Sequence, residues 1–445
     1  MTETTQQKIK HWTSSVSLKI AFIGLLILLL MIPITLIDGV VDERIKFKQE
    51  AQSQVSQMWG QEQNIIGPVF QIPYISKYKN SDGKIETLKH KLHFTAHNLN
   101  INSKVESKTL KRGVFEVPVY ESKMTIKGDF KFPDLSKLHI SPKDLDMVNF
   151  ALAVGVSDAR TLRGDINLEI AGHRLNFEPG TQGVENLSEG IHILLGNHLN
   201  FDTSANTVPF EITFNIVGSQ KLKFFPLGEN VSLQMSSDWT SPSFMGNYIP
   251  NERNIDTEGF EASWKLPRFG RDLPQAWSGN KLNHNRIYQN TFGVDFILPV
   301  DSYTQTVRAI KYTLLFILLT FGVFFLMEIL HGLKIHPIQY LVVGLALCLF
   351  YLLLLSFSEQ IDFVYSYIIS AIACISVISL YSLALLKNKT LALSIFGLLN
   401  VLYGFLYVLL QAEEASLLFG SIGLFLALTG FMYKTRKIDW YNIKS

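Results

Sequence analysis

The sequence YTLLFILLTFGVFFLMEIL, residues 312–330, is followed after a short joint by IQYLVVGLALCLFYLLLLSF, residues 338–357. Three more apolar segments follow, again separated by short polar joints, at 363–386, 391–410 and 416–433. A run of about 20 apolar residues is long enough to cross the hydrocarbon core of a bilayer as a helix. The region 312–433 therefore predicts a bundle of five membrane-spanning helices, with the lipid bilayer as its surroundings.

One further apolar run, residues 20–37, lies near the N-terminus and has no charged residue. As a helix it would be roughly 27 Å long, which is close to the thickness of the hydrocarbon core. The polar residues 1–19 before it include Lys8, Lys10 and Lys19. A cleaved signal peptide is the alternative, but its apolar run is usually shorter and ends at a small-residue cleavage site, which is absent here. The sequence therefore predicts an uncleaved signal anchor and six spans in total.

The composition separates a membrane part from an ordinary domain. The chain has 445 residues, of which 47% are hydrophobic and only 18% are charged, against about 25% charged in a soluble domain. A net charge of +2 gives no argument for nucleic acid as a partner. Both cysteines, Cys348 and Cys374, fall in apolar segments, so the region between the first two spans has no disulfide.

The region between residues 38 and 303 is predicted to contain a helical stalk and a β domain. In the stalk, 38–64, Val41, Ile45, Val55 and Met58 recur at helical spacing; a solvated spacer is the alternative. From 65 to 303 the period changes to two, as in Phe210–Phe214, with Gly, Pro, Asn and Asp between the segments. This pattern predicts many short strands in an all-β, sandwich-like domain. One helix is expected within 135–154, beginning near Ser141.

The charges of the short segments predict the orientation. Six spans place both termini on one side, and ten basic residues lie on that side: Lys8, Lys10, Lys19, Lys334, Lys387, Lys389, Lys434, Arg436, Lys437 and Lys444. The joints on the other side, 358–362 and 411–415, have none. Arg44, Lys46, Lys48, Arg308 and Lys311 flank the long domain, and long domains translocate largely regardless of charge. The N-terminus and the tail 434–445 are therefore expected in the cytoplasm, with the β domain extracytoplasmic.

In the membrane segments, Glu328 is the main candidate for a functional residue. Glu328 and His331 have the spacing of half a carboxylate-bridged di-metal motif, but the other segments supply no carboxylate at depth. A role of Glu328 remains a hypothesis because ionisable residues in membrane segments are usually functional. His336, Gln339 and Tyr340 open the next segment and are interpreted as a helix start and interfacial anchor. Asn400 is the one strongly polar residue near the centre of its segment and is interpreted as a helix–helix contact.

In the β domain, Asp158 and Arg160 follow Ser157 at the end of an apolar strand. A serine beside an aspartate suggests catalysis, although the simpler interpretation is a carboxylate that caps the next turn and pairs with Arg160. Phe244 and Trp264 are interpreted as a packed loop over the sandwich, or else as an exposed aromatic surface for peptidoglycan, lipid or a partner protein. The sequence has no phosphate-binding loop and no His-Glu-x-x-His zinc motif. No catalytic set, metal site or cofactor is therefore predicted.

Several segments resemble one known family. His336–Gly344, HPIQYLVVG, and Phe350–Ser356, FYLLLLS, closely resemble the CreD family of bacterial inner-membrane proteins. Further similar segments are Gly67-Pro68, Ser157–Arg160, Phe177–Gly180, Ser241–Gly246 and Asp439–Tyr441. The resemblance covers residues 18–442 and implies an envelope-integrity protein under a Cre-type two-component response, linked to β-lactam and colicin tolerance. The family has no agreed biochemical activity, so it implies no catalytic residue.

These observations predict a non-enzymatic inner-membrane protein that supports the cell envelope. Its β domain would bind periplasmic or envelope proteins, peptidoglycan or lipid. The first alternative is a transporter or channel for a lipid or small solute, with Glu328 and Asn400 as coupling groups. The second alternative is an envelope hydrolase with Ser157 as the nucleophile.

Overall fold

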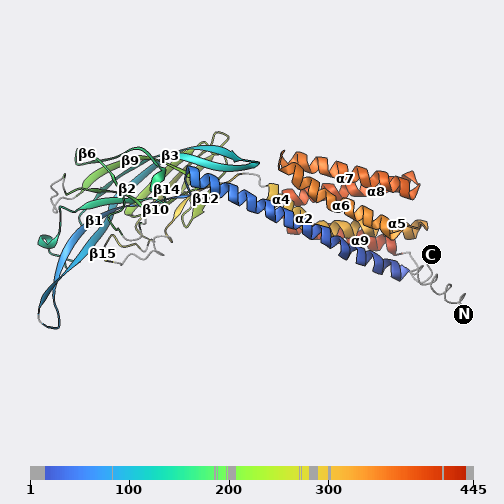
Figure 1. The fold of residues 1–445 in the computed structure, drawn as a ribbon, viewed down its shortest axis with the longest axis horizontal. Coiled ribbons are helices and arrows are strands. Elements are labelled where there is room, and N and C mark those ends of the chain that lie inside the picture. Colours follow the sequence, from blue (N-terminus) through green and yellow to red (C-terminus); the bar gives the residue numbers. More distant parts are fainter. Residues whose placement is uncertain are drawn as a thin grey trace. The chain divides into compact units, whose positions relative to one another are not determined.

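The chain folds into two compact units in the computed structural model (Figure 1). The structure describes residues 16–82, 84–184, 187, 189–196, 198, 207–269, 271, 273–279, 289–298, 302–412 and 415–436. The membrane unit consists of Met1–Lys48 and Val300–Ser445, and the β unit consists of Gln49–Pro299. Helix and strand are thus segregated, which confirms the predicted fold class of a helical membrane bundle with an all-β domain.

Among the described residues, six helices are long and apolar enough to cross a membrane, as predicted. They are α2 (Val16–Trp59), α5 (Thr313–His331), α6 (Pro337–Ser358), α7 (Phe363–Leu386), α8 (Lys389–Gln411) and α9 (Ser416–Thr435). A further helix, α4 (Ser302–Lys311), precedes α5 and was not predicted. It was missed because it is short and amphipathic and lies where the expected β domain ends.

Local sequence explains where the helices begin and end. Asp362 accepts a hydrogen bond from the Val364 N–H at the start of α7, and Asn388 does the same for Thr390 in α8. Such side-chain acceptors satisfy the first free N–H groups of a helix. At the end of α5, Gly332 adopts a left-handed conformation with φ of 62°, which glycine tolerates best.

Helix α2 is continuous from the apolar segment into the stretch predicted as a stalk. The stalk was predicted to reach residue 64, but the helix ends at Trp59 and β1 begins at Gln63. The chain turns at Gly60, where a Cβ atom would lie 2.9 Å from the Val217 carbonyl oxygen. The solvated-spacer alternative is also wrong for the last turns, because Val55 is buried against Val117 and Val119.

The β unit contains sixteen strands in its described part, which are all linked by pairing. The strands are β1 (Gln63–Lys79), β2 (Ile85–Arg112), β3 (Phe115–Phe130), β4 (Ala151–Gly155), β5 (Leu162–Ile170), β6 (His173–Asn176), β7 (Glu178–Pro179), β8 (Gly190–Leu194), β9 (Val208–Ser219), β10 (Lys221–Pro226), β11 (Gly228–Ser237), β12 (Pro242–Gly246), β13 (Glu252–Ile255), β14 (Phe260–Leu266), β15 (Ala276–Ser278) and β16 (Phe292–Phe296). The expectation of short strands is wrong for β1, β2 and β3, which have 17, 28 and 16 residues.

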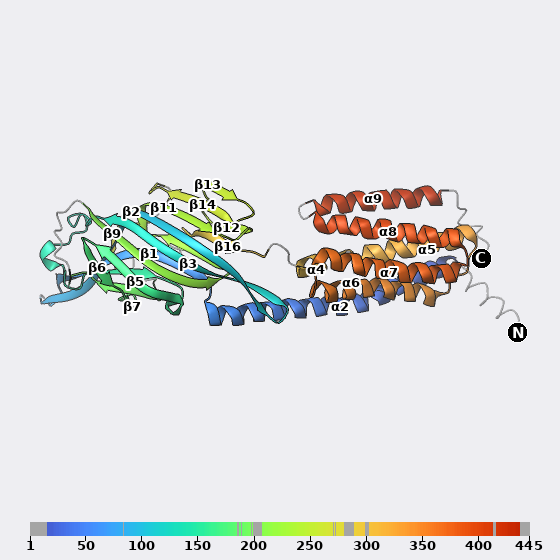
Figure 2. The ribbon, with the colours of Figure 1, turned by 90° about the horizontal axis from the view of Figure 1, so that it is seen from above.

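The strands form two layers that share β2. One layer has the order β12-β16-β10-β1, and β1 continues to β4 and to the first half of β2. The other has the order β13-β14-β11-β2-β3-β9-β5-β6 and uses the second half of β2 (Figure 2). Phe70 and Phe94 of the first layer and Met124, Ile212 and Trp264 of the second belong to one hydrophobic core. Long strands that pass from one layer to the other are a known way to build a sandwich.

The helix expected within 135–154 is absent. A three-residue 3-10 turn, Pro142–Asp144, occupies the expected helix start, and β4 follows at Ala151–Gly155. Every residue of β4 is buried between β1 and β8. Pairing with strands distant in sequence therefore decides the conformation of this segment, which local spacing could not reveal.

Candidate functional site

Helix α2 carries one buried stripe through the membrane unit. Its buried residues recur every three or four positions: Leu26, Leu30, Ile34, Ile37 and Val41. A Cβ atom on Gly344 of α6 would lie 2.2 Å from Leu30 Cδ1, so α2 and α6 approach closely at this glycine. Arg44 lies three residues after Val41, and Lys19 lies seven residues, about two helical turns, before Leu26, so a cation stands beyond each end of the stripe.

At the first end of the stripe, the carboxylate of Glu328 joins three helices. Lys19 Nζ of α2 lies 2.7 Å from Glu328 Oε1. Tyr340 of α6 donates its hydroxyl to Glu328 Oε2 at 3.1 Å, and the Ile335 N–H donates to Oε1 at 3.2 Å. The Glu328 residue is only 5% exposed. A buried carboxylate is tolerated where donors of this kind compensate it.

The joint between α5 and α6 is folded by the residues that the sequence singled out. The Leu333 N–H donates to the Glu328 carbonyl at 3.0 Å. His336 Nδ1 accepts from the Ile338 N–H at 3.3 Å, and Gln339 Oε1 accepts from the His336 N–H at 2.8 Å. This capping box starts α6 and brings Tyr340 onto Glu328. Tyr340 therefore contacts Glu328 directly, whereas His336 and Gln339 act on the helix start.

The second end of the stripe has its own ion pair. Arg44 Nε of α2 lies 3.4 Å from Glu359 Oε1, just after α6, and Tyr303 of α4 donates its hydroxyl to the same oxygen at 3.1 Å. Along α2, Lys19 and Arg44 are about 38 Å apart at 1.5 Å per residue. A bilayer with its headgroups is about 40–45 Å thick. We call these two pairs, Lys19–Glu328 and Arg44–Glu359, the latches of α2.

Sequence reasoning found Glu328 and Tyr340 but missed their cationic partner and the whole second latch. Lys19 was counted only toward the orientation, and Arg44 only as an exception to it. The available signal was the spacing, because both cations continue the apolar stripe of α2. Chemically, the latches hold α2 against α4, α5 and α6. His331 Nδ1 bonds to the Met327 carbonyl of its own helix, and the described residues contain no group of three metal-ligating side chains.

Asn400 is not brought to Glu328. It is exposed on α8, and its Nδ2 donates to the Phe396 carbonyl of the same helix at 2.8 Å. Polar side chains that do bond from one helix to another lie elsewhere in the bundle. Tyr367 of α7 donates to the Tyr403 carbonyl of α8 at 2.6 Å, and the Tyr403 hydroxyl donates to Cys374 Sγ of α7 at 3.0 Å. The helix–helix contact predicted for Asn400 is therefore wrong, because its amide bonds within its own helix.

In the β unit, Asp158 caps a turn. It accepts from the Arg160 backbone N–H at 3.0 Å and from the Arg160 guanidinium at 2.9 and 2.8 Å. The hydrogen bonds from Arg160 lower the pKa of Asp158, which burial alone would raise. Ser157 Oγ accepts from the Asn64 N–H at 2.8 Å. These contacts match the predicted turn cap, with Arg160 as its ion-pair partner.

Trp264 belongs to the core and not to a surface. It is 0% exposed and donates through Nε1 to the Tyr248 carbonyl at 3.1 Å. Phe244 is half-buried and packs edge-on against Trp264, with ring centres 5.8 Å apart. Trp264 is packed over the sandwich core, as the main interpretation expected, but on a strand and not in a loop. The alternative of an exposed aromatic surface is wrong for Trp264, because Phe260, Ala262, Trp264 and Leu266 all lie on the inward face of β14.

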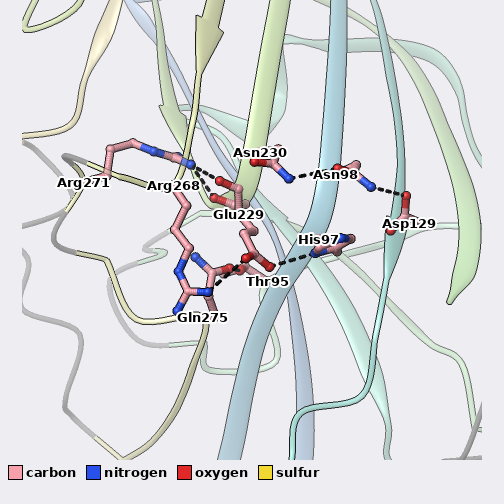
Figure 3. A network of polar contacts seen from close by, with 10 residues as sticks. Thr95, His97, Asn98, Asp129, Glu229, Asn230, Arg268, Arg271 and Gln275 are labelled. Carbon is pink, nitrogen blue, oxygen red and sulfur yellow. Dashed lines mark hydrogen bonds and ion pairs between the residues drawn. The ribbon is translucent and has the colours of Figure 1, made fainter. Parts of the chain in front are cut away.

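A polar network in the β unit was also missed (Figure 3). Glu229 accepts from His97 at 2.7 Å and from Arg268 at 3.0 Å, and Arg271 donates to the carbonyls of Gly228 and Glu229. Burial alone would raise the pKa of Glu229, but the bonds from His97 and Arg268 lower it overall. The network ties the chain after β14 to β2 and β11. Its members on β2 and its members on β11 are about 130 or more positions apart in the sequence. Local spacing therefore could not predict the network.

Comparison with known proteins assigns the family. The sequence profile described as "CreD: Inner membrane protein CreD" matches residues 15–441. The chain is 33% identical over 419 residues to the "Inner membrane protein CreD" of Escherichia coli (strain K12), which covers 93% of this chain and 91% of that protein. With six apolar helices and this match over nearly its whole length, the chain belongs to the CreD family of inner membrane proteins and is a multi-pass protein of that membrane.

Proposed function

We propose that this protein supports the integrity of the cell envelope without catalysing a reaction, by presenting the β unit as a binding module in the periplasm. The observation that carries the proposal is the difference between the two units of the chain. In the membrane unit, the buried carboxylate of Glu328 is bonded to two other helices, through Lys19 and Tyr340. The β unit is a separate compact unit, and the chain connects it to membrane helices at both ends.

The periplasmic location is proposed from charge. Ten basic residues flank the spans on one side, and the two short joints on the other side have none. Substituted-cysteine labelling tests this, because the native Cys348 and Cys374 are buried. A membrane-impermeant maleimide should label Ser81→Cys, in the turn after β1, in intact cells with a permeable outer membrane. It should label Lys434→Cys, near the end of α9, only after the inner membrane is opened. The reverse pattern would contradict the proposed orientation.

The binding role is tested by photocrosslinking in intact cells. A photoreactive amino acid is placed at Gln234 and at Ile249, which are exposed on the β unit. Leu380, which is 67% exposed on α7, is the matched control in the membrane unit. Specific capture of an envelope component from Gln234 or Ile249, but not from Leu380, is expected. Absence of capture from every exposed β-unit position would remove the basis of the binding-module proposal.

The absence of catalysis is tested on the serine that a hydrolase would use. Envelope stress tolerance should be unchanged in Ser157→Ala, provided that the variant protein accumulates to the normal level. A loss of tolerance with normal accumulation would instead favour a hydrolase.

A further inference from the structure

The outward face of the second β layer carries a line of uncharged polar side chains. Six of them occupy paired positions on six neighbouring strands: Ser263 of β14, Gln234 of β11, Asn102 of β2, Thr125 of β3, Thr213 of β9 and Asn167 of β5. Figure 2 shows these strands side by side. Neighbouring strands are about 4.8 Å apart, so this amide–hydroxyl row extends for about 24 Å across the sheet.

The row differs from its surroundings in its hydrogen bonding. Within the described part of the chain, the side chains of Ser263, Gln234, Asn102, Thr125 and Thr213 make no hydrogen bond; only Asn167 does, accepting from Arg174 Nε at 3.2 Å. On one side of the row, in contrast, outward residues of β2 and β11 bond to each other. Ser232 donates to Asn100 at 2.5 Å, and Asn230 donates to Asn98 at 3.2 Å. The row is therefore a continuous set of donors and acceptors that neighbouring side chains leave open.

One member of the row is shielded from water as well. Ser263 Oγ is buried and has no hydrogen-bond partner among the described residues. It lines a hollow of about 470 Å³ that Asn102 and Gln234 also line. Gln234 and Asn102 are both exposed, so a ligand group in the hollow would meet their amides.

The chemistry of the row selects the class of ligand. Its six members carry no charge, and the charged side chains that line the same hollow, Glu252, Arg253 and Glu261, have mixed signs. The row therefore gives no net electrostatic attraction for a phosphate-rich or acidic polymer. It also has no Trp, Tyr or Arg, the side chains that usually dominate the binding energy of protein interfaces. Amide and hydroxyl groups donate and accept hydrogen bonds equally well. Hydroxyl and acetamido groups of sugars are their natural counterparts.

We propose that the amide–hydroxyl row binds a neutral glycan strand rich in hydroxyl and acetamido groups, which lies across the β-strands. This inference rests on the proposed binding function of the β unit and names its ligand. The side chains beside the row define the competing occupant. Lys127 and Glu211 neutralise each other at 3.1 Å, but Lys104 and Lys123 are paired across β2 and β3 and are both exposed. An acidic polymer bound at these lysines is the outcome to be distinguished.

The test uses the full chain in lipid nanodiscs and a hexamer of N-acetylglucosamine as the probe, with binding followed by calorimetry. The proposal expects saturable binding that changes less than twofold between 50 and 500 mM salt, because the row is uncharged. Thr125→Val combined with Thr213→Val removes two hydroxyls from the centre of the row but keeps β-branched side chains. This double variant should bind at least tenfold more weakly. Thr109→Val, on β2 outside the row, is the matched control and should change affinity less than twofold.

Four results would overturn the proposal: no binding of the hexamer at millimolar concentration, normal binding by the double variant, equal weakening by Thr109→Val, or salt-sensitive binding that Lys123→Gln abolishes. The last result, together with binding of an oligogalacturonate, would assign the face to an acidic polymer. If crosslinking from Gln234 captures a protein while the hexamer does not bind, the glycan assignment fails but the binding-module proposal stands. If the hexamer does not bind and no exposed β-unit position captures an envelope component, both fail.

Discussion

In the membrane unit the carboxylate of Glu328 receives hydrogen bonds or ion pairs from Lys19, Tyr340 and the Ile335 backbone. In the β unit the side chains of Gln234 and Asn102 bond to no described residue, although they lie in the middle of a sheet. The two environments explain the difference. The bilayer core offers no hydrogen bonds, so a buried charge such as the Glu328 carboxylate needs partners inside the protein. Water can hydrogen-bond to the polar side chains on an outward sheet face. A polar pattern there is therefore not needed for folding and indicates binding instead.

The sharpest test of this comparison is Glu328→Leu. The variant leaves Lys19 and the Tyr340 hydroxyl without their partner, and loss of one member of a buried pair costs about 3 kcal/mol. We expect the free energy of unfolding in mixed micelles to fall by about that amount. Glu328→Gln is the matched control, since it keeps an acceptor for Tyr340, and should lose about 1 kcal/mol. A Leu variant as stable as the wild type would mean that the latch does not hold the helices.

His93 gives an intermediate case, a buried polar group with only part of its bonding satisfied. It is 1% exposed, contacts Gln71 at 3.2 Å through Nε2, and has no partner for Nδ1 among the described residues. Burial, together with the charge of Lys91, lowers its pKa from 6.5 to about 4. Between these values the unfolded chain binds the proton and the folded chain does not. Stability should therefore decrease as the pH falls through this range.

The size of the His93 effect is about 2–3 kcal/mol between pH 7 and pH 4. It can be measured by chemical unfolding followed through tryptophan fluorescence at several pH values. His93→Gln should flatten the curve over this range. His90→Gln, at a half-buried position on the same strand, is the control and should leave the slope unchanged. An identical slope in wild type and His93→Gln would show that another group causes the pH dependence.

Tyr340→Phe tests a single bond of the first latch. The variant keeps the ring, which packs edge-on against Phe321 with centres 5.4 Å apart, and removes the hydroxyl. We expect a loss of about 1 kcal/mol, because the carboxylate keeps Lys19 and the Ile335 N–H. Unfolding in mixed micelles measures it. A loss as large as that of Glu328→Leu would show that Tyr340, and not Lys19, carries most of the contact.

The smallest effect is expected in the amide–hydroxyl row. Thr125→Val with Thr213→Val should change the free energy of unfolding by less than about 0.5 kcal/mol, since the lost hydroxyls bond to water alone. The same chemical unfolding measurement applies to the double variant. A larger loss would mean that the row stabilises the fold. The row and Glu328 would then no longer differ in their contribution to stability.

Much of this contrast could be predicted from sequence, because composition decides which segments enter a membrane. The ends of α5 to α9 differ by no more than two residues from the apolar segments at 312–433. Glu328 and Tyr340 stood out for similar reasons, as polar residues at the edge of apolar runs. Their partner did not stand out, because Lys19 is 309 positions away from Glu328 and pairs with it only through packing of three helices.

The β unit was harder to predict in detail. The alternation of apolar and polar residues predicted β9 correctly, but it does not show which strands pair. Pairing with distant strands explains why β2 has 28 residues and why residues 151–155 form a strand. Trp264 illustrates the limit. Prolines and glycines near it in sequence predicted a packed loop over the sandwich, whereas Trp264 lies on strand β14, on the face that points into the core. The amide–hydroxyl row is invisible in sequence, since its members come from six strands spread over a hundred positions and more.

The parallel pairing in the β unit has a consequence for the order of synthesis. β1 pairs with β10, beginning at Gln63 and Leu222, and β2 pairs with β11. β10 also pairs with β16, at Phe292–Phe296, which is synthesised after all the other strands named above. The first strands to be made therefore keep open edges until almost the whole unit has emerged, and such edges are prone to pair with other chains. We expect this nascent domain to depend on chaperones that shield strand edges, and a chain stopped before Phe292 to aggregate instead of folding.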